Sequence, residues 1–173
     1  MFIRFSTEKD KPQICELIKL CFDGRENHNG IKDLNGRYLL AFDKECNVLA
    51  MTGLMWSNEY NAYEIDWTCT HPKHRKSGIM HELFKRICAL TDEAIYCSCW
   101  RLSDDRKINL YSLMRDFGFQ EVITNRATWD VKYNCTCGAG TYCMGRKSKT
   151  TSDSLEKSSC RCYEDLYLRE ARQ

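Results

Sequence analysis

The 173-residue sequence lacks an apolar run of membrane-spanning length, and its first residues, MFIRFSTEKDK, lack the apolar core of a signal peptide. Since a spanning helix needs about 20 predominantly apolar residues, we expect a soluble cytoplasmic protein that neither crosses nor binds a membrane. An excess of one charge is also missing, because 26 Lys and Arg residues stand against 24 Asp and Glu residues. This balance gives no support for a nucleic-acid binder.

The sequence does contain enough apolar residues for a core, and it contains many cysteines. Hydrophobic residues make up 43% and aromatic residues 12%, which predicts a globular chain of one domain with a small appendage. The cysteines number 12, which in a short secreted chain would predict a disulfide framework. The length and the missing signal segment instead favour reduced thiols, a metal site or both, with Cys21 and Cys88 in the core.

Hydrophobic periodicity predicts both strands and helices along the chain. Alternating segments predict strands, and apolar residues three and four apart predict helices, the first of which follows a capping box of Asp10 and Gln13. Strand runs mixed with two helical crossovers indicate an α/β (α+β) fold with a central mixed sheet and helices on its faces. The predicted strands are 2–6, 37–43, 48–57, 62–70, 94–100, 119–124 and 127–133, and the predicted helices are 11–22, 79–90 and 107–117.

The strand over 62–70 runs through HPKHRKSGIM into an amphipathic helix. The N-terminus of a helix presents unpaired N–H groups and the positive end of the helix dipole, so anions bind there. Gly78 lets the backbone approach an anion closely, and His74, Arg75 and Lys76 add positive charge. A single glycine after R-x-x also fits an ordinary basic turn, so this pattern alone leaves both interpretations open.

Together with two further segments, this stretch resembles the GNAT superfamily of N-acetyltransferases. The family's strand, pyrophosphate loop and helix are similar to IDWTCTHPKHRKSGIM. Its helix that ends in Gly-Phe is similar to LMRDFGF, and its first strand and helix are similar to IRFSTEKD. The resemblance covers residues 1–133 and implies a mixed, mostly antiparallel sheet that binds acetyl-CoA where two strands splay apart. It implies cofactor contacts from Thr68, Cys69, Thr70, Arg75, Lys76, Ser77, Gly78, Ile79, Met80 and Asn109.

The resemblance implies direct transfer of an acetyl group from acetyl-CoA to a primary amine. Such transfer needs a neutral amine, a polarised thioester and a proton for the leaving thiolate. Glu64 and Asp66 share a strand face; Glu64 falls where histone-acetylating members carry their glutamate base, and Asp66 competes for the role. The family's usual tyrosine acid is replaced by Met114, for which Tyr111, one turn earlier, is the candidate substitute. Met80 replaces the last Gly or Ala of the loop, so we expect its side chain on the helix-packing side.

Residues 134–173 differ in composition and form a cysteine-rich extension, which we expect to close with a short helix over 160–173. Four thiolates could hold a structural zinc ion in this segment, whose apolar content is low. Free thiols or disulfides are the alternative. The candidate zinc ligands are Cys135, Cys137, Cys160 and Cys162, with Cys143 in place of one of them.

Two other functions fit the same residues. One is a CoA-binding or partner-binding module with weak or no catalysis and a zinc-stabilised tail, in which Met80 and Met114 mark the lost activity. The other is a zinc-dependent interaction protein. The sequence also leaves open the amine acceptor, which could be a small molecule, a peptide N-terminus, a lysine or an antibiotic, and whether the chain forms a homodimer.

Overall fold

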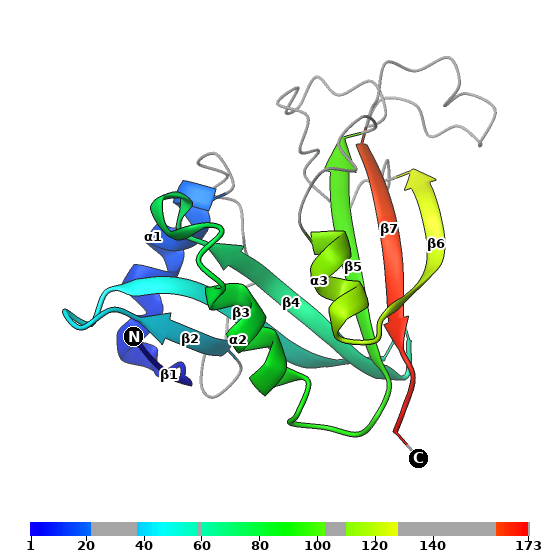
Figure 1. The fold of residues 1–173 in the computed structure, drawn as a ribbon, viewed down its shortest axis with the longest axis horizontal. Coiled ribbons are helices and arrows are strands. Elements are labelled where there is room, and N and C mark those ends of the chain that lie inside the picture. The colour runs from blue at the N-terminus through cyan, green and yellow to red at the C-terminus, as the bar shows by residue number, and fades with distance from the viewer. Residues whose placement is uncertain (22–37, 59, 103–109, 128–161, 173) are drawn as a thin grey trace. The chain divides into compact units, whose positions relative to one another are not determined.

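The computed structural model follows the predicted alternation of strands and helices (Figure 1). It describes residues 1–21, 38–58, 60–102, 110–127 and 162–172. The chain divides into two units, one of Met1–Tyr96 with Glu170–Gln173 and one of Cys97–Arg169. The strands are β1 (Phe2–Phe5), β2 (Tyr38–Phe42), β3 (Val48–Ser57), β4 (Ala62–Thr70), β5 (Ile95–Leu102), β6 (Gln120–Ala127) and β7 (Cys162–Arg169); the helices are α1 (Lys11–Cys21), α2 (Ile79–Ile87) and α3 (Leu110–Asp116), with 3-10 turns η1 (Glu8–Asp10) and η2 (Pro72–His74).

The seven strands form one sheet in the order β1-β2-β3-β4-β5-β7-β6. The described pairings between β1 and β2, β2 and β3, β3 and β4, and β6 and β7 are all antiparallel. The expected α/β (α+β) class, with a mostly antiparallel central sheet and helices on its faces, is therefore confirmed.

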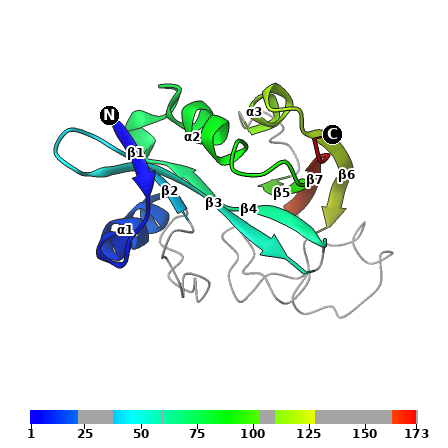
Figure 2. The same ribbon diagram turned by 90° about the horizontal axis from the view of Figure 1, so that it is seen from below.

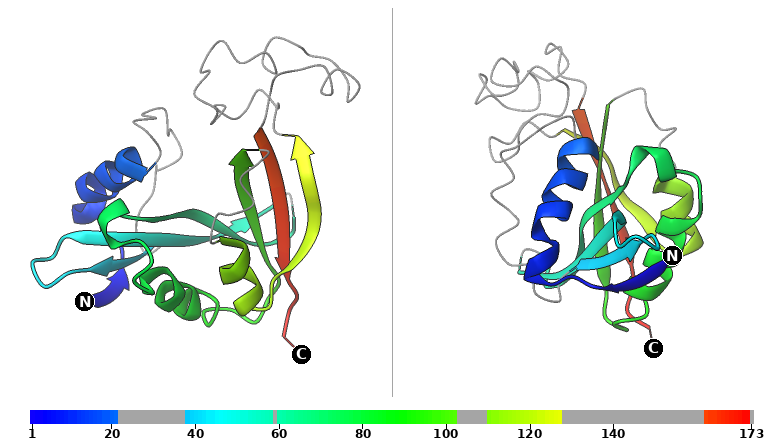
Figure 3. Two further views of the ribbon diagram at one scale, coloured as in Figure 1. Left: turned by 45° about the horizontal axis from the view of Figure 1, so that its top comes forward. Right: turned by 90° about the vertical axis from the view of Figure 1, so that its left-hand side faces the viewer.

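In the first unit, β1 to β4 form a meander that has a helix on each face. α1 covers one face of these strands and α2 covers the other, as Figures 2 and 3 show. Since both faces are covered, β2 and the first part of β3 are buried throughout and carry apolar runs rather than a clean alternation. These strands are the hairpin that the sequence predicted.

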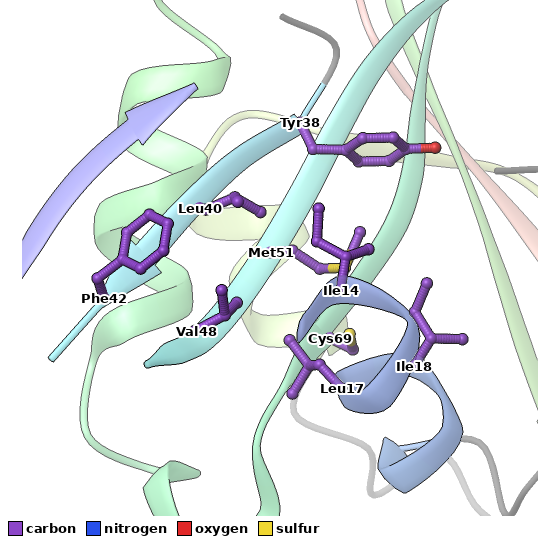
Figure 4. Close-up of a cluster of buried hydrophobic side chains, with 9 residues drawn as sticks. All are labelled: Ile14, Leu17, Ile18, Tyr38, Leu40, Phe42, Val48, Met51 and Cys69. Atoms are coloured by element: carbon purple, nitrogen blue, oxygen red, sulfur yellow. The ribbon is translucent and has the colours of Figure 1, made fainter. Parts of the chain in front are cut away.

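The face toward α1 carries an apolar cluster (Figure 4). α1 contributes residues three and four positions apart, which form one side of a helix. Cys69 points from β4 toward α1 and lies beside Leu17 and Ile18 (Figure 4). Burial of one large apolar side chain stabilises the fold by about 1.5–3 kcal/mol, so this cluster anchors α1 to the sheet. Its members are Ile14, Leu17, Ile18, Tyr38, Leu40, Phe42, Val48, Met51 and Cys69.

The opposite face is covered by α2, which packs against β2 and β3. Its buried residues are Ile79, Leu83, Phe84 and Ile87. Met80, which was expected on the packing side, is half-buried. The packed stripe therefore begins one residue earlier than the sequence indicated.

The entry to α1 differs from the predicted capping box. The Asp10 carboxylate accepts hydrogen bonds from the Thr7 backbone N–H at 2.7 Å and from the Thr7 hydroxyl at 2.8 Å. Gln13 instead ties α1 to the β2–β3 hairpin, because its Oε1 accepts from the Val48 N–H at 2.8 Å and its Nε2 donates to the Cys46 carbonyl at 3.3 Å. The predicted pairing of Asp10 with Gln13 is wrong, because Gln13 has a tertiary partner.

The second unit contains β5 from Cys97 onward, α3, β6 and β7. Gly118 ends α3 with φ 78°, the left-handed conformation of a helix stop, and Met114 and Phe119 on either side of it are buried. The predicted closing helix over 160–173 is wrong, because Cys162–Arg169 is a strand that pairs with β6. The segment predicted as the last strand, 127–133, lies outside the described residues after Ala127, and the boundary of the cysteine-rich extension stays a prediction.

Candidate functional site

A bulge interrupts β4 near its end. Met51 pairs with Cys69 and Gly53 pairs with Asp66, so the one residue between them on β3, Thr52, is matched by two on β4, Trp67 and Thr68. The extra residue is accommodated at Trp67, whose φ is 35°. A bulge leaves the local backbone out of the ladder and turns the strand, and such features concentrate near active sites.

This bulge corrects the predicted alternation of β4. The sequence placed Cys69 on the face of Tyr63 and Ile65, opposite Asp66. Residues that pair directly across a sheet share a face, so Cys69 shares the face of Met51 and Asp66 shares the face of Gly53. Met51 and Gly53 are two residues apart on β3, so all four residues lie on the face that α1 covers. Thr68 is turned to the other face, where its hydroxyl is 2.9 Å from that of the buried Thr52.

Asp66 is held by a tyrosine that lies two strands away. Tyr38 on β2 pairs with Gly53 on β3, which pairs in turn with Asp66 on β4. The fully buried Tyr38 ring crosses over Gly53, and its hydroxyl donates to Asp66 Oδ2 at 2.7 Å. A buried tyrosine hydroxyl needs such a partner, so this carboxylate completes the core.

Glu64 lies on the same face as Asp66, as the sequence predicted. Its partner in the ladder is Met55, two residues from Gly53. Two residues along a strand correspond to roughly 6.6 Å, so the carboxylates are neighbours on one half-buried strip.

The loop after β4 has the backbone geometry of an anion site. Lys76 and Gly78 both adopt a left-handed conformation, with φ 63° and 80°. Gly78 is the residue that caps α2, and no side chain caps the helix there. The first N–H groups of a helix have no partner inside it, so those of α2 are oriented toward this turn.

The side chains around the loop are mainly basic. Lys73, His74, Arg75 and Lys76 are all exposed. The carboxylate in the first turn of α2, Glu82, is paired with Arg86 at 3.0 Å. Arg75 folds back, and its Nε donates to the Thr70 carbonyl at 3.3 Å. The loop therefore combines a helix N-terminus, two left-handed residues and local positive charge, which together suit a diphosphate.

Beside the loop, a groove of about 400 Å³ lies between α1, the β2–β3 hairpin and η2. Glu16 and Asp43 line it together with His71, Lys73 and His74. Because charges of both signs line the groove, it indicates no single class of ligand.

The described residues cover part of the predicted site. The first unit contains Glu64, Asp66 and the loop residues from Thr68 to Met80. Asn109 lies outside the described residues. Four of the zinc candidates also lie outside them: Cys135, Cys137, Cys143 and Cys160. Tyr111 falls within α3 and Cys162 begins β7. Among the described residues no group of three His, Cys, Asp or Glu side chains could hold a metal ion. No described helix could cross a membrane.

Sequence reasoning missed Tyr38 and Gly53, whose contribution depends on the pairing of three strands. The only sequence signal was a glycine within an apolar strand, which often marks a close approach. A Cβ on Gly53 would lie 2.7 Å from Tyr38 Cε1, so the structure does bring another side chain close to this glycine.

A mixed sheet with a bulged strand, a glycine loop and an amphipathic helix defines a fold that many solved structures share. An acetyltransferase of the GNAT family from Staphylococcus aureus Mu50 is 13% identical, with a TM-score of 0.63 over 99% of both chains. An aminoglycoside 6'-N-acetyltransferase complexed with coenzyme A is 10% identical, with a TM-score of 0.65 over 98% of this chain and 96% of that one. The ribosomal-protein-S18-alanine N-acetyltransferase from Escherichia coli is 10% identical, with a TM-score of 0.58 over 96% and 90%.

No protein-family model and no curated protein sequence matches the chain. The chain nevertheless has the fold of the GNAT acetyltransferases, as the sequence resemblance implied.

Proposed function

We propose that this protein binds acetyl-CoA and transfers its acetyl group directly to a primary amine. The observation that carries the proposal is the loop at the end of the bulged β4, where Lys76 and Gly78 turn the backbone into the N-terminus of α2. In a GNAT fold this loop is the expected site of the pyrophosphate. The N–H groups from Arg75 to Met80 would hold it, with Arg75 and Lys76 adding charge.

Acetyl-CoA, when bound, supplies an acetyl group that is activated as a thioester. The residues of this chain must orient it, and they must accept the proton that the attacking amine loses. The backbone at the bulge, from Thr68 to Thr70, is the part that would orient the pantetheine arm and the thioester. Tyr111 is retained as the proposed donor to the leaving thiolate, since Met114 is fully buried and carries no acidic proton.

We assign the base to Glu64 rather than to Asp66. Asp66 already completes the core by accepting the hydroxyl of the buried Tyr38. Glu64 lies two residues before Asp66 on the same half-buried strip, and the printed bond of the Tyr38 hydroxyl ends on Asp66. Removal of a general base lowers turnover by about 10²- to 10⁴-fold. Glu64→Gln should therefore lower kcat by that factor and leave the affinity for acetyl-CoA unchanged, whereas Asp66→Asn keeps an acceptor for Tyr38 and should have a smaller effect.

The test has a binding arm and a turnover arm. Calorimetric titration with CoA and acetyl-CoA measures binding, with 3'-phosphoadenosine as a ligand that lacks the diphosphate arm. Turnover is followed by chromatography of released CoA across small amines, peptide N-termini, lysine peptides and aminoglycosides, because the 12 cysteines of the chain would react with a thiol dye. Absence of binding at millimolar CoA would refute the proposal. Binding without release of CoA on any acceptor would instead indicate a CoA-binding module.

A further inference from the structure

Two cysteines meet where α1 ends and β4 ends. Cys21, the last residue of α1, packs against the cluster that contains Cys69, and its Sγ donates to the Thr70 carbonyl at 3.3 Å. Cys69, which precedes Thr70 in β4, belongs to this cluster, and the two thiols lie close enough to shift each other's pKa. The bulge in β4 makes this possible, since strict alternation from Asp66 would turn Cys69 to the other face.

The two thiols have different surroundings. Cys21 is half-buried, and the Arg75 guanidinium, which is bonded to the same Thr70 carbonyl, lies next to it. The hydrogen bond from Cys69 lowers the pKa of Cys21 to about 7, against the opposing effect of burial and with further help from Arg75. Cys69 is buried, and its pKa is raised well above the usual value, first by its bond to Cys21 and then by burial.

This asymmetry assigns a role to each sulfur. A thiolate is the nucleophile in thiol oxidation, and a thiolate that is reachable from solvent and next to a cation reacts first. A second thiol within hydrogen-bonding reach can then displace the oxidised group. Cys15 on the same helix is exposed and serves as the natural comparison, because no described interaction links it to another sulfur.

We propose that Cys21 is an oxidant-reactive site and that Cys69 is its resolving partner. Hydrogen peroxide transfers one oxygen to the Cys21 thiolate, which becomes a sulfenic acid while hydroxide leaves and is protonated to water. The Cys69 sulfur then attacks the Cys21 sulfur, the S–O bond breaks, and the Cys69 proton leaves with the hydroxyl as water. In total, two thiols and one peroxide yield one disulfide and two waters. The inference does not rest on the proposed acetyl transfer.

The first measurement is the site of oxidation in the full chain. Trypsin releases Cys21 in the peptide 20–25 and Cys69 in the peptide 45–73, which also contains Cys46. The experiment therefore uses a Cys46→Ser background, low equivalents of hydrogen peroxide, alkylation of the remaining thiols and mass spectrometry. We expect the linked pair of peptides to be the first disulfide to form and to disappear after dithiothreitol. The proposal would be overturned if Cys21 formed disulfides with other cysteines in preference to Cys69. It would also be overturned if Cys21 stayed unmodified after other thiols had been oxidised.

Three variants separate the two roles. Cys69→Ala should stop disulfide formation and let the Cys21 sulfenic acid accumulate, detected by dimedone. Cys21→Ser should abolish both products, and Cys15→Ser should leave them unchanged. Circular dichroism shows whether the buried Cys69→Ala variant is folded.

If the Cys69→Ala variant does not fold, the alkylation rate of Cys21 in the parent chain still provides a test. The rate of Cys21 alkylation by iodoacetamide should rise with pH around a midpoint near 7 and, at neutral pH, exceed that of an ordinary thiol about three- to fourfold. Arg75→Gln should move the midpoint upward, and Arg75→Lys should not. A midpoint at the ordinary thiol value in the parent chain would contradict the assignment of Cys21 as the attacking thiolate.

Discussion

The Tyr38 hydroxyl donates to Asp66 Oδ2 at 2.7 Å from two strands away, across the backbone of Gly53. This contact depends on two local features of the sheet, a glycine in β3 and a bulge in β4. Gly53 has no side chain in the path of the ring, and the bulge at Trp67 brings Asp66, rather than Trp67, opposite Gly53. The relationship therefore links the core on the α1 side to the carboxylate strip of the candidate site.

Removal of the Tyr38 hydroxyl should weaken the fold slightly. Tyr38→Phe keeps the buried ring and deletes one hydrogen bond, while Asp66, which is half-buried, can still be hydrated. We expect the free energy of unfolding in urea to fall by about 0.5–1.5 kcal/mol, with an unchanged m-value. Tyr63→Phe is the control, since Tyr63 is a half-buried strand tyrosine that packs edge-on against Trp56. Equal losses in both variants would mean that the bond to Asp66 contributes nothing specific.

Gly53→Ala should destabilise the protein although alanine usually suits a strand better than glycine. The added Cβ would lie 2.7 Å from Tyr38 Cε1 and 2.8 Å from Tyr38 Cδ1, so a ring fixed in the core would have to shift. Overpacking of this kind costs about 1–3 kcal/mol. In a Tyr38→Leu background the ring is gone, and the same change should cost less. If the losses of stability in this double-mutant cycle were additive, the Cβ added at position 53 would not clash with the Tyr38 ring.

Most of the fold could be predicted because its elements carry strong local periodicity. β2, β3, β4 and α2 were placed within a few residues of their observed bounds, since apolar spacing reports burial directly. The errors have a different cause. Cys162–Arg169 is a strand because β6 pairs with it, and a short segment with mixed spacing does not reveal such a distant partner.

The candidate site shows the same division. The strand position of Glu64 and the turn from Arg75 to Met80 into α2 could be predicted, because each depends on the spacing along one short segment. Tyr38 and the pairing of Cys21 with Cys69 could not. Both depend on the register between β3 and β4, where one extra residue reverses the face of everything after it.

Asp10 should make stability sensitive to acid. Arg4 donates two hydrogen bonds to the Asp10 carboxylate, each 2.7 Å long. These bonds and those from Thr7 hold the pKa of Asp10 well below its usual range. A carboxylate with a lowered folded-state pKa stabilises the fold above its unfolded value of about 4, and this contribution is lost as the pH falls further.

We therefore expect Asp10→Asn to lower the free energy of unfolding by about 1–3 kcal/mol at pH 7. The difference from the parent chain should narrow below about pH 4, as the Asp10 carboxylate becomes protonated in the unfolded chain. Asp92→Asn is the matched control, because Asp92 is 78% exposed and its nitrogen partner on Arg172 is 3.8 Å away. A gap that stays constant down to pH 2 would contradict the assigned role of the carboxylate charge.

Gly78→Ala offers the sharpest test of the loop, because the chain contains a matched glycine outside it. Gly78 has φ 80° and Gly118 has φ 78°, and a Cβ on either residue would meet nothing within 4 Å. The constraint on both is thus conformational rather than steric, and an alanine in the left-handed region costs about 1–2 kcal/mol. Both variants should lose a similar amount of stability in thermal unfolding.

Their effects on CoA binding should differ. If the N–H groups at the start of α2 hold the pyrophosphate, a backbone that relaxes away from φ 80° at Gly78 misplaces them, and the affinity for CoA falls. Gly118 ends α3, at a distance along the chain from the loop, and its variant should bind CoA as the parent does. Equal affinity in the Gly78→Ala variant and the parent, measured by calorimetry on folded protein, would remove the loop from the proposed site. A loss in the Gly118→Ala variant of the same size as in Gly78→Ala would show that the affinity follows global stability rather than the geometry of the loop.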